Sequence, residues 1–74
     1  MAYNLLMKEP PYIDIIRQIM YEKKLSQQKL ADMLDVNQTT VSQWLLGNKK
    51  PSYDNISKFY SVFGIEPNDF FDLK

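Results

Sequence analysis

The sequence predicts a single, small, all-α domain built from about five short helices. Apolar residues recur every three or four positions through most of the 74 residues, as they do on one face of a helix. Residues that favour helix starts and helix ends stand between these segments. No segment requires a strand.

The first helix is expected just after two consecutive prolines. Pro10 and Pro11 disfavour helix at the residues before them, and they separate an N-terminal arm, residues 1–11, from a domain of residues 12–74. The domain opens with an amphipathic helix from Tyr12 to about Lys24. Its apolar residues are Ile13, Ile16, Ile19 and Met20.

The next two helices follow each other closely. Ser26 is a good N-cap, because its hydroxyl accepts a backbone N–H that would otherwise be unpaired. The second helix ends near Asp35, and Asn37 is the N-cap candidate of a third helix that runs to Leu46. Gly47 is expected just past that end, since glycine adopts the left-handed conformation at no steric cost. The apolar residues are Leu30, Ala31, Met33 and Leu34 in the second helix and Val41, Trp44 and Leu45 in the third.

A loop over residues 48–51 leads to the last two helices. Ser52 can cap a fourth helix, which Gly64 closes. Glu66 and Pro67 start a fifth short helix, with proline at its favoured first position. The apolar residues are Ile56, Phe59, Tyr60 and Phe63 in the fourth helix and Phe70, Phe71 and Leu73 in the fifth.

The composition argues against several classes of protein. Cysteine is absent, so no disulfide forms, and histidine, the commonest general base and transition-metal ligand, is absent too. We therefore expect no enzyme, no bound metal or cofactor, and no small-molecule ligand. No apolar run approaches the roughly 18 residues of a membrane span, and the start, MAYNLLMKEPP, does not resemble a signal peptide. A soluble, cytoplasmic protein is the expectation.

The charge distribution permits DNA binding but does not require it. The formal net charge is zero, which gives no overall attraction to phosphates. However, the stretch between Asp35 and Asp54 contains no acidic residue and carries Lys49 and Lys50. The chain can therefore present a positive face despite its neutrality.

The polar face of the third helix is the clearest functional signal. No charged residue lies between Asn37 and Leu46, whereas a merely solvated face more often carries Lys and Glu. Glutamine can bond adenine through two hydrogen bonds, and a threonine methyl can contact that of thymine. The alternative is that the organism simply favours such residues. Opposite the apolar residues of this helix stand Gln38, Thr39, Ser42 and Gln43, with Thr40 near the edge.

The run LSQQKLADMLDVNQTTVSQWLLGNKKPS resembles the core of the phage Cro and repressor-type helix-turn-helix family, whose fold is the lambda-repressor-like DNA-binding domain. The family pattern has Leu-Ser-Gln, Leu-Ala, a turn Val, an apolar residue before Ser, an aromatic residue, Gly, and a later Pro-Ser. The resemblance covers roughly residues 13–73, and Phe70-Phe71 is similar to the C-terminal apolar pair of the family. The matching residues are Leu25, Ser26, Gln27, Leu30, Ala31, Val36, Val41, Ser42, Trp44, Gly47, Pro51 and Ser52.

The resemblance implies a compact five-helix domain whose helix-turn-helix comprises helices two and three, with the third helix in the major groove. It places Gln38, Thr39, Ser42 and Gln43 at the base-reading positions. Each role has a simpler alternative: Gln27 only decorates a helix start, Lys49 is only solvated, and Trp44 is core rather than a DNA contact. The positions that contact the DNA backbone are Gln27, Asn37, Thr40, Asn48, Lys49 and Lys50.

Three residues depart from the family pattern. Asp35 stands where the family has a turn glycine, and aspartate tolerates the left-handed region better than most residues. Met20 and Leu45 stand where the family has an Arg and a Glu that form a buried ion pair. Replacing both partners by apolar residues is often neutral or stabilising, so we interpret these two departures as one coupled exchange.

The function that the resemblance implies is sequence-specific binding of double-stranded DNA by a transcriptional regulator, most simply a repressor. One recognition helix reads only a few base pairs, so a homodimer on a palindromic site with half-sites about 34 Å apart is expected. Such a protein acts in the cytoplasm of a bacterial or phage-infected cell, at the nucleoid. The dimer candidates are Tyr60, Phe63, Ile65 and Phe70, of which Phe63 and Phe70 fit a core role equally well.

The alternative is a protein-interaction module, such as an antitoxin-like or regulatory partner, that keeps the fold and reads DNA weakly or not at all. The near-neutral charge and the tyrosines at positions 3, 12, 21, 53 and 60 favour this alternative slightly. Salt-dependent DNA binding distinguishes the two classes, because phosphate contacts give a steep dependence on salt.

Overall fold

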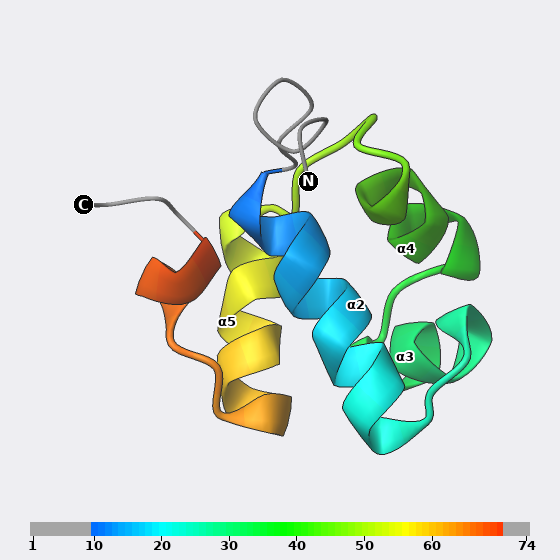
Figure 1. Cartoon of the computed structure of the whole chain (residues 1–74), viewed down its shortest axis with the longest axis horizontal. Coiled ribbons are helices and arrows are strands. Elements are labelled where there is room, and N and C mark those ends of the chain that lie inside the picture. Colours follow the sequence, from blue (N-terminus) through cyan, green and yellow to red (C-terminus); the bar gives the residue numbers. More distant parts are fainter. Residues whose placement is uncertain (1–9, 71–74) are drawn as a thin grey trace, which may run out of the picture.

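The computed structural model describes residues 10–70 as four α-helices and one short 3₁₀ helix (Figure 1). The described residues contain no strand, so the prediction of an all-α fold is confirmed for this part of the chain. None of these helices is both long and apolar enough to cross a membrane. In chain order the elements are α2 (Pro11–Lys23), α3 (Gln27–Leu34), α4 (Gln38–Leu45), α5 (Tyr53–Phe63) and η1 (Pro67–Phe70).

The helices pack around one shared core. α3 lies against both α4 and α5, while α2 contacts α4 and η1, and η1 also contacts α5. In Figure 1, α3 and α4 occupy one side of α2, and η1 lies on the other side of α5. The second and third predicted helices therefore form one edge of the domain, and the C-terminal part of the described chain forms the opposite edge.

The helix starts agree with the caps predicted from the sequence, with two differences. Ser26 Oγ accepts a hydrogen bond from the Lys29 backbone N–H at 3.1 Å, and Ser52 forms a reciprocal capping box with Asn55. Asn37 occupies the N-cap position of α4, but its side chain makes no capping hydrogen bond. α2 begins at Pro11 rather than Tyr12, since the first position of a helix needs no backbone N–H.

Three of the helices end in the same kind of turn. A residue just past the helix adopts the left-handed conformation, with φ of 55° at Lys24, 57° at Asp35 and 79° at Gly47. The backbone N–H that follows then bonds a carbonyl five residues back, which is the Schellman arrangement. These bonds are Leu25 to Met20 at 2.8 Å, Val36 to Ala31 at 2.9 Å and Asn48 to Gln43 at 3.0 Å.

The predicted fifth α-helix is wrong for the described residues, which form a 3₁₀ helix of four residues instead. Its closing hydrogen bond runs from the Asp69 N–H to the Glu66 carbonyl at 3.0 Å. So short a segment cannot repay the cost of nucleating an α-helix, and the tighter i→i+3 bond is the usual result. Phe71 and Leu73, expected on that helix, lie outside the described residues, as does most of the predicted N-terminal arm.

The centre of the core is aromatic. The ring of Phe59 lies 5.0 Å from that of Phe70, 5.7 Å from that of Trp44 and 6.1 Å from that of Phe63. These tilted arrangements are favourable for aromatic pairs, and they link α4, α5 and η1 through one side chain. The residues of the buried core cluster are Tyr12, Ile13, Ile16, Ile19, Leu30, Ala31, Leu34, Val41, Trp44, Ile56, Phe59 and Phe70.

Met20 and Leu45, interpreted as a coupled exchange, are both half-buried and pack against this core. They belong to α2 and α4, two helices that are in contact. Both side chains are therefore only partly buried, and they pack at the edge of the core. The coupling between them stays a prediction.

Candidate nucleic-acid interface

α3, the turn at residues 35–37 and α4 form the helix-turn-helix predicted from the sequence. The turn is three residues long because Asp35 takes the left-handed conformation, with φ 57° and ψ 46°. The backbone N–H of Val36 is then held by the Ala31 carbonyl at 2.9 Å. Aspartate thus provides the conformation that glycine gives the family at this position.

The orientation of α4 is set by two buried residues. Trp44 is 1% exposed and Val41 is 0% exposed, so the helix is anchored by its apolar face against α3 and the core. Trp44 is therefore a core residue, as its simpler interpretation held. The opposite face carries the four predicted base-reading residues: Gln38 and Thr39 are exposed, and Ser42 and Gln43 are half-buried.

Two carboxamides at the end of α4 are in contact. Asn48 Nδ2 donates a hydrogen bond to Gln43 Oε1 at 3.1 Å. The sequence places these residues in different groups, Gln43 among the base readers and Asn48 among the phosphate contacts. Because the Schellman turn brings Asn48 back over α4, the structure joins them.

The exposed polar face of α4 that carries the four predicted base-reading residues is called the recognition face below. The predicted phosphate contacts surround this face rather than lying on it. Asn37 precedes α4 and is exposed, and Lys49 and Lys50 follow it and are exposed as well. Thr40, at the edge of the face, and Gln27, at the first position of α3, are half-buried. This placement is compatible with contacts to the DNA backbone on either side of the groove; the individual contacts stay predictions.

Leu46 is a candidate contact that the sequence did not single out. Its side chain is 66% exposed at the end of α4, four positions beyond Ser42 and seven beyond Thr39, and its N–H still bonds the Ser42 carbonyl at 3.0 Å. Residues at these spacings share a helix face. An exposed leucine there can contact a thymine methyl, and the spacing from Ser42 was the available signal.

The predicted dimer residues divide into different environments. Phe70 is only 4% exposed and its ring packs at a tilt against that of Phe59, so its side chain belongs to the core of the monomer and is not available to a partner. Phe63 and Ile65 are half-buried against the same core. Tyr60 is 51% exposed, which makes it the best-placed of the four for a contact between subunits.

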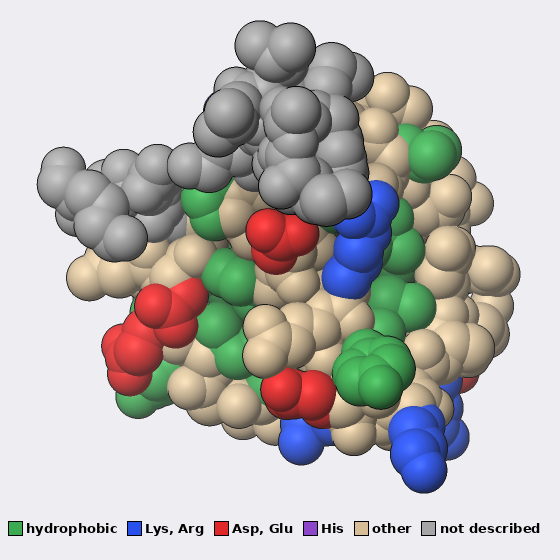
Figure 2. Space-filling model, viewed as in Figure 1, with side chains coloured by type: hydrophobic (Ala, Val, Ile, Leu, Met, Phe, Trp, Pro, Cys, Tyr) green, Lys and Arg blue, Asp and Glu red, His purple; other side chains and the backbone are tan. Residues whose placement is uncertain are grey.

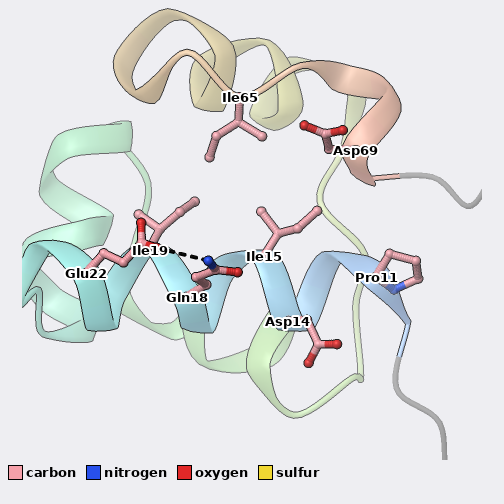
Figure 3. A pocket seen from close by; sticks show the side chains of 8 residues that line it. All are labelled: Pro11, Asp14, Ile15, Gln18, Ile19, Glu22, Ile65 and Asp69. Carbon is pink, nitrogen blue, oxygen red and sulfur yellow. Dashed lines mark hydrogen bonds between the residues drawn. The ribbon is translucent and has the colours of Figure 1, made fainter.

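An open groove of about 490 Å³ lies away from the recognition face, between α2 and the segment that leads into η1. Figure 3 shows Ile65 pointing across the groove toward Ile15 and Ile19 of α2. The charged residues that line it are Asp14, Glu22 and Asp69, all acidic, and Figure 2 shows acidic side chains around the exposed hydrophobic ones on this side. A groove of this charge repels DNA phosphates, so it does not extend the recognition face.

Comparison with known proteins agrees with this geometry. The family model described as "Helix-turn-helix" matches residues 16–70, which include all of α3, α4, α5 and η1. The chain is 38% identical over 59 residues to Control protein C.BamHI of Bacillus amyloliquefaciens, an alignment that covers 78% of this chain and 73% of that protein. No solved structure matches the chain significantly.

Proposed function

Since this chain belongs to the Cro/repressor-type helix-turn-helix family of DNA-binding regulators, we propose that it represses transcription by binding a palindromic operator as a homodimer. In this proposal α4 enters the major groove, and its exposed polar residues read the bases. The relative's name, a control protein, supports a regulatory role. The proposal assigns the chain a binding function and no reaction, in the cytoplasm where the nucleoid lies.

One observation carries the proposal. α4 is fixed to the core by Val41 and Trp44, and it presents an uncharged face of carboxamides and hydroxyls. Such groups can select bases by hydrogen bonding at the groove floor, whereas a lysine beside the groove that bonds a phosphate carries no sequence information. Lys49 and Lys50, just past α4, are suited to that second task.

The dimer follows from the size of the recognition helix. A helix of eight residues reads only a few base pairs, and symmetric half-sites need a two-fold pair of subunits. Tyr60 supports an interface on the exposed side of α5, whereas Ile65 lines the acidic groove. The acidic groove is unsuitable for a self-contact, because a two-fold axis would place its carboxylates near their own copies.

Selection of bound duplexes from a random oligonucleotide pool tests the proposed function. We expect a recovered palindrome with half-site centres about 10–10.5 base pairs apart, and an affinity that falls steeply with salt. Recovery of no sequence, together with no duplex binding at low salt, would contradict DNA reading and favour the protein-interaction module.

The dimer is tested by sedimentation of the free protein and by cooperativity on the selected site. Tyr60→Asp should lower self-association and the apparent affinity for the full palindrome, with little change for a single half-site. Tyr21→Asp is the matched control, since Tyr21 is 85% exposed on α2. Equal effects of the two substitutions would place the interface elsewhere.

A further inference from the structure

The backbone at the end of α4 brings Asn48 over Gln43. Gly47 has φ of 79°, a conformation that side chains rarely adopt, and it turns the chain sharply back. The Asn48 N–H then donates to the Gln43 carbonyl at 3.0 Å, and the Lys49 N–H reaches the same oxygen at 3.3 Å. The proximity of the two residues is therefore a property of the turn.

Asn48 and Gln43 make a polar contact that is unusual for a turn of this kind. In a Schellman turn these two positions frequently make an apolar contact, whereas here Asn48 Nδ2 donates to Gln43 Oε1 at 3.1 Å. A hydrogen bond between exposed groups replaces bonds to water and contributes little to stability. Its consequence lies instead in the direction that it gives the Gln43 carboxamide.

We propose that Asn48 is a specificity-determining residue, because it turns the Gln43 carboxamide so that its NH₂ group, and not its oxygen, faces the DNA. This inference rests on the proposed function, since it concerns how α4 reads one base. A carboxamide has an acceptor oxygen at one corner and two donor hydrogens at the other. With the oxygen directed to Asn48, Gln43 offers a donor.

A glutamine whose NH₂ group is held toward the DNA selects a different set of bases from a glutamine whose carboxamide can rotate freely. It pairs with acceptors at the groove floor, namely guanine O6 and N7, adenine N7 or thymine O4, and it finds no partner at the amino group of cytosine. The paired donor and acceptor contacts with adenine need both corners of the carboxamide, so Gln43 is expected to forgo them. Gln38, whose side chain is exposed at the start of α4, keeps both corners available.

Docking on DNA strengthens this selection. When the interface excludes water, the hydrogen bond between Asn48 and Gln43 gains strength from the lower local dielectric. A reversal of the Gln43 carboxamide alone would then leave the donor of Asn48 facing the donor of Gln43; Asn48, which is also a carboxamide, has to turn as well before its oxygen can accept from Gln43. A base that needs the Gln43 oxygen therefore requires two side chains to turn together rather than one.

Selection experiments with four proteins test the inference: the unaltered chain, Gln43→Ala, Asn48→Ala and Asn48→Asp. Gln43→Ala identifies the base position that Gln43 reads. We expect cytosine to be disfavoured there by the unaltered chain, and a loss of roughly tenfold in that discrimination at the same position for Asn48→Ala. An aspartate cannot donate, so Asn48→Asp should bond the Gln43 NH₂, turn the oxygen outward, and shift the preference toward cytosine or adenine.

Lys49→Ala is the matched control, because Lys49 is the next residue and is exposed. It should weaken binding to all sequences and leave base preferences intact. If Asn48→Ala behaves in the same way, Asn48 is a phosphate contact and the inference is wrong, while the proposed function stands. If Gln43→Ala alters no position, the inference is also wrong. Recovery of no site by the unaltered chain overturns the proposed function and the inference together, and circular dichroism of each variant verifies folding.

Discussion

In the proposed function, the residues on and around α4 divide into those that select a sequence and those that only bind the DNA backbone. Gln38 is exposed at the first position of the helix, where side chains of a recognition helix reach base edges. Lys49 lies past the helix end, where a flexible ammonium suits a phosphate and carries no sequence information. Substitution of Gln38 should therefore weaken the preference for one sequence, whereas substitution of Lys49 should weaken binding to all sequences.

Gln38→Ala should cost about 1–3 kcal/mol of binding to the preferred site and relax the preference at one base position. Lys49→Ala should weaken all duplexes about equally and reduce the salt slope by about one. Titrations at several salt concentrations, on the selected site and on a scrambled duplex, measure both. Gln28→Ala is the control, because Gln28 is exposed on α3 and bonds Asp32 at 2.9 Å. An unchanged selected site for Gln38→Ala would mean that the reading face is misplaced.

At the scale of single residues, the sequence predicted which side of α4 is exposed and polar, but not the hydrogen bond that forms there. The spacing of the apolar residues correctly predicted which side of α4 is buried, because Val41 and Trp44 both pack into the core. It could not predict the contact of Gln43 with Asn48, which depends on the left-handed turn between them. It likewise missed Leu46, since an apolar residue at a helix end is ordinarily assigned to the core.

Among the elements, the turns rather than the helices hold unusual conformations. Lys24 and Asp35 have positive φ and are not glycine, which costs about 1–2 kcal/mol for an ordinary residue and less for aspartate. The neighbouring Lys23 is the last residue of α2 and has helical geometry. The same substitution at adjacent lysines should therefore have opposite effects.

Lys24→Gly should stabilise the domain by about 0.5–1 kcal/mol, since relief of the left-handed strain exceeds the greater entropy of glycine in the unfolded chain. Lys23→Gly should destabilise it by about 1 kcal/mol or less, because glycine is a poor helix former. Thermal unfolding measures both, as shifts of a few degrees in opposite directions. Destabilisation by Lys24→Gly would show that the lysine side chain itself holds the turn.

The contact between α2 and α4 tests the coupled exchange. Because Met20 and Leu45 are half-buried, Met20→Arg can extend its charge toward water, and we expect a loss of about 1–3 kcal/mol rather than that of a fully buried charge. Adding Leu45→Glu should recover part of that loss. A double-mutant cycle in urea gives the coupling energy, and strictly additive effects would contradict the alignment on which the base-contact assignments depend.

Over the whole molecule, stability depends on one cluster of side chains. Phe59 belongs to α5, yet its ring contacts an aromatic ring of α4, another of α5 and one of η1. A domain of this size buries a modest fraction of its surface, so its margin of stability is small. Removal of this ring should affect all of the helices together and not α5 alone.

Phe59→Ala should cost about 3–5 kcal/mol, because it leaves a cavity as well as removing buried surface. We expect a large drop in the melting midpoint with a single transition. Tyr53→Ala, at a position 78% exposed on the same helix, should change stability by less than about 0.5 kcal/mol. Two separate transitions for Phe59→Ala would indicate that the helix-turn-helix holds together without α5.

The sequence predicted the helix order and nearly every boundary, since caps and left-handed residues are local signals. It failed at η1, where Pro67 and Phe70 suggested an α-helix and the chain forms a single 3₁₀ segment. It also left Phe70 open between core and interface. Both questions depend on how the C-terminal segment meets Phe59, and no local pattern records that contact.

The short connections between helices bear on how fast the chain folds. Only residues 24–26 separate α2 from α3, and residues 35–37 separate α3 from α4. The search for partners thus takes place mostly among near neighbours along the chain, and little loop entropy is lost before contacts form. Helical domains with such local topology fold in microseconds to milliseconds. A molecule of this kind refolds soon after each transient unfolding, so a small margin of stability need not mean that the polar face of α4 is lost for long periods.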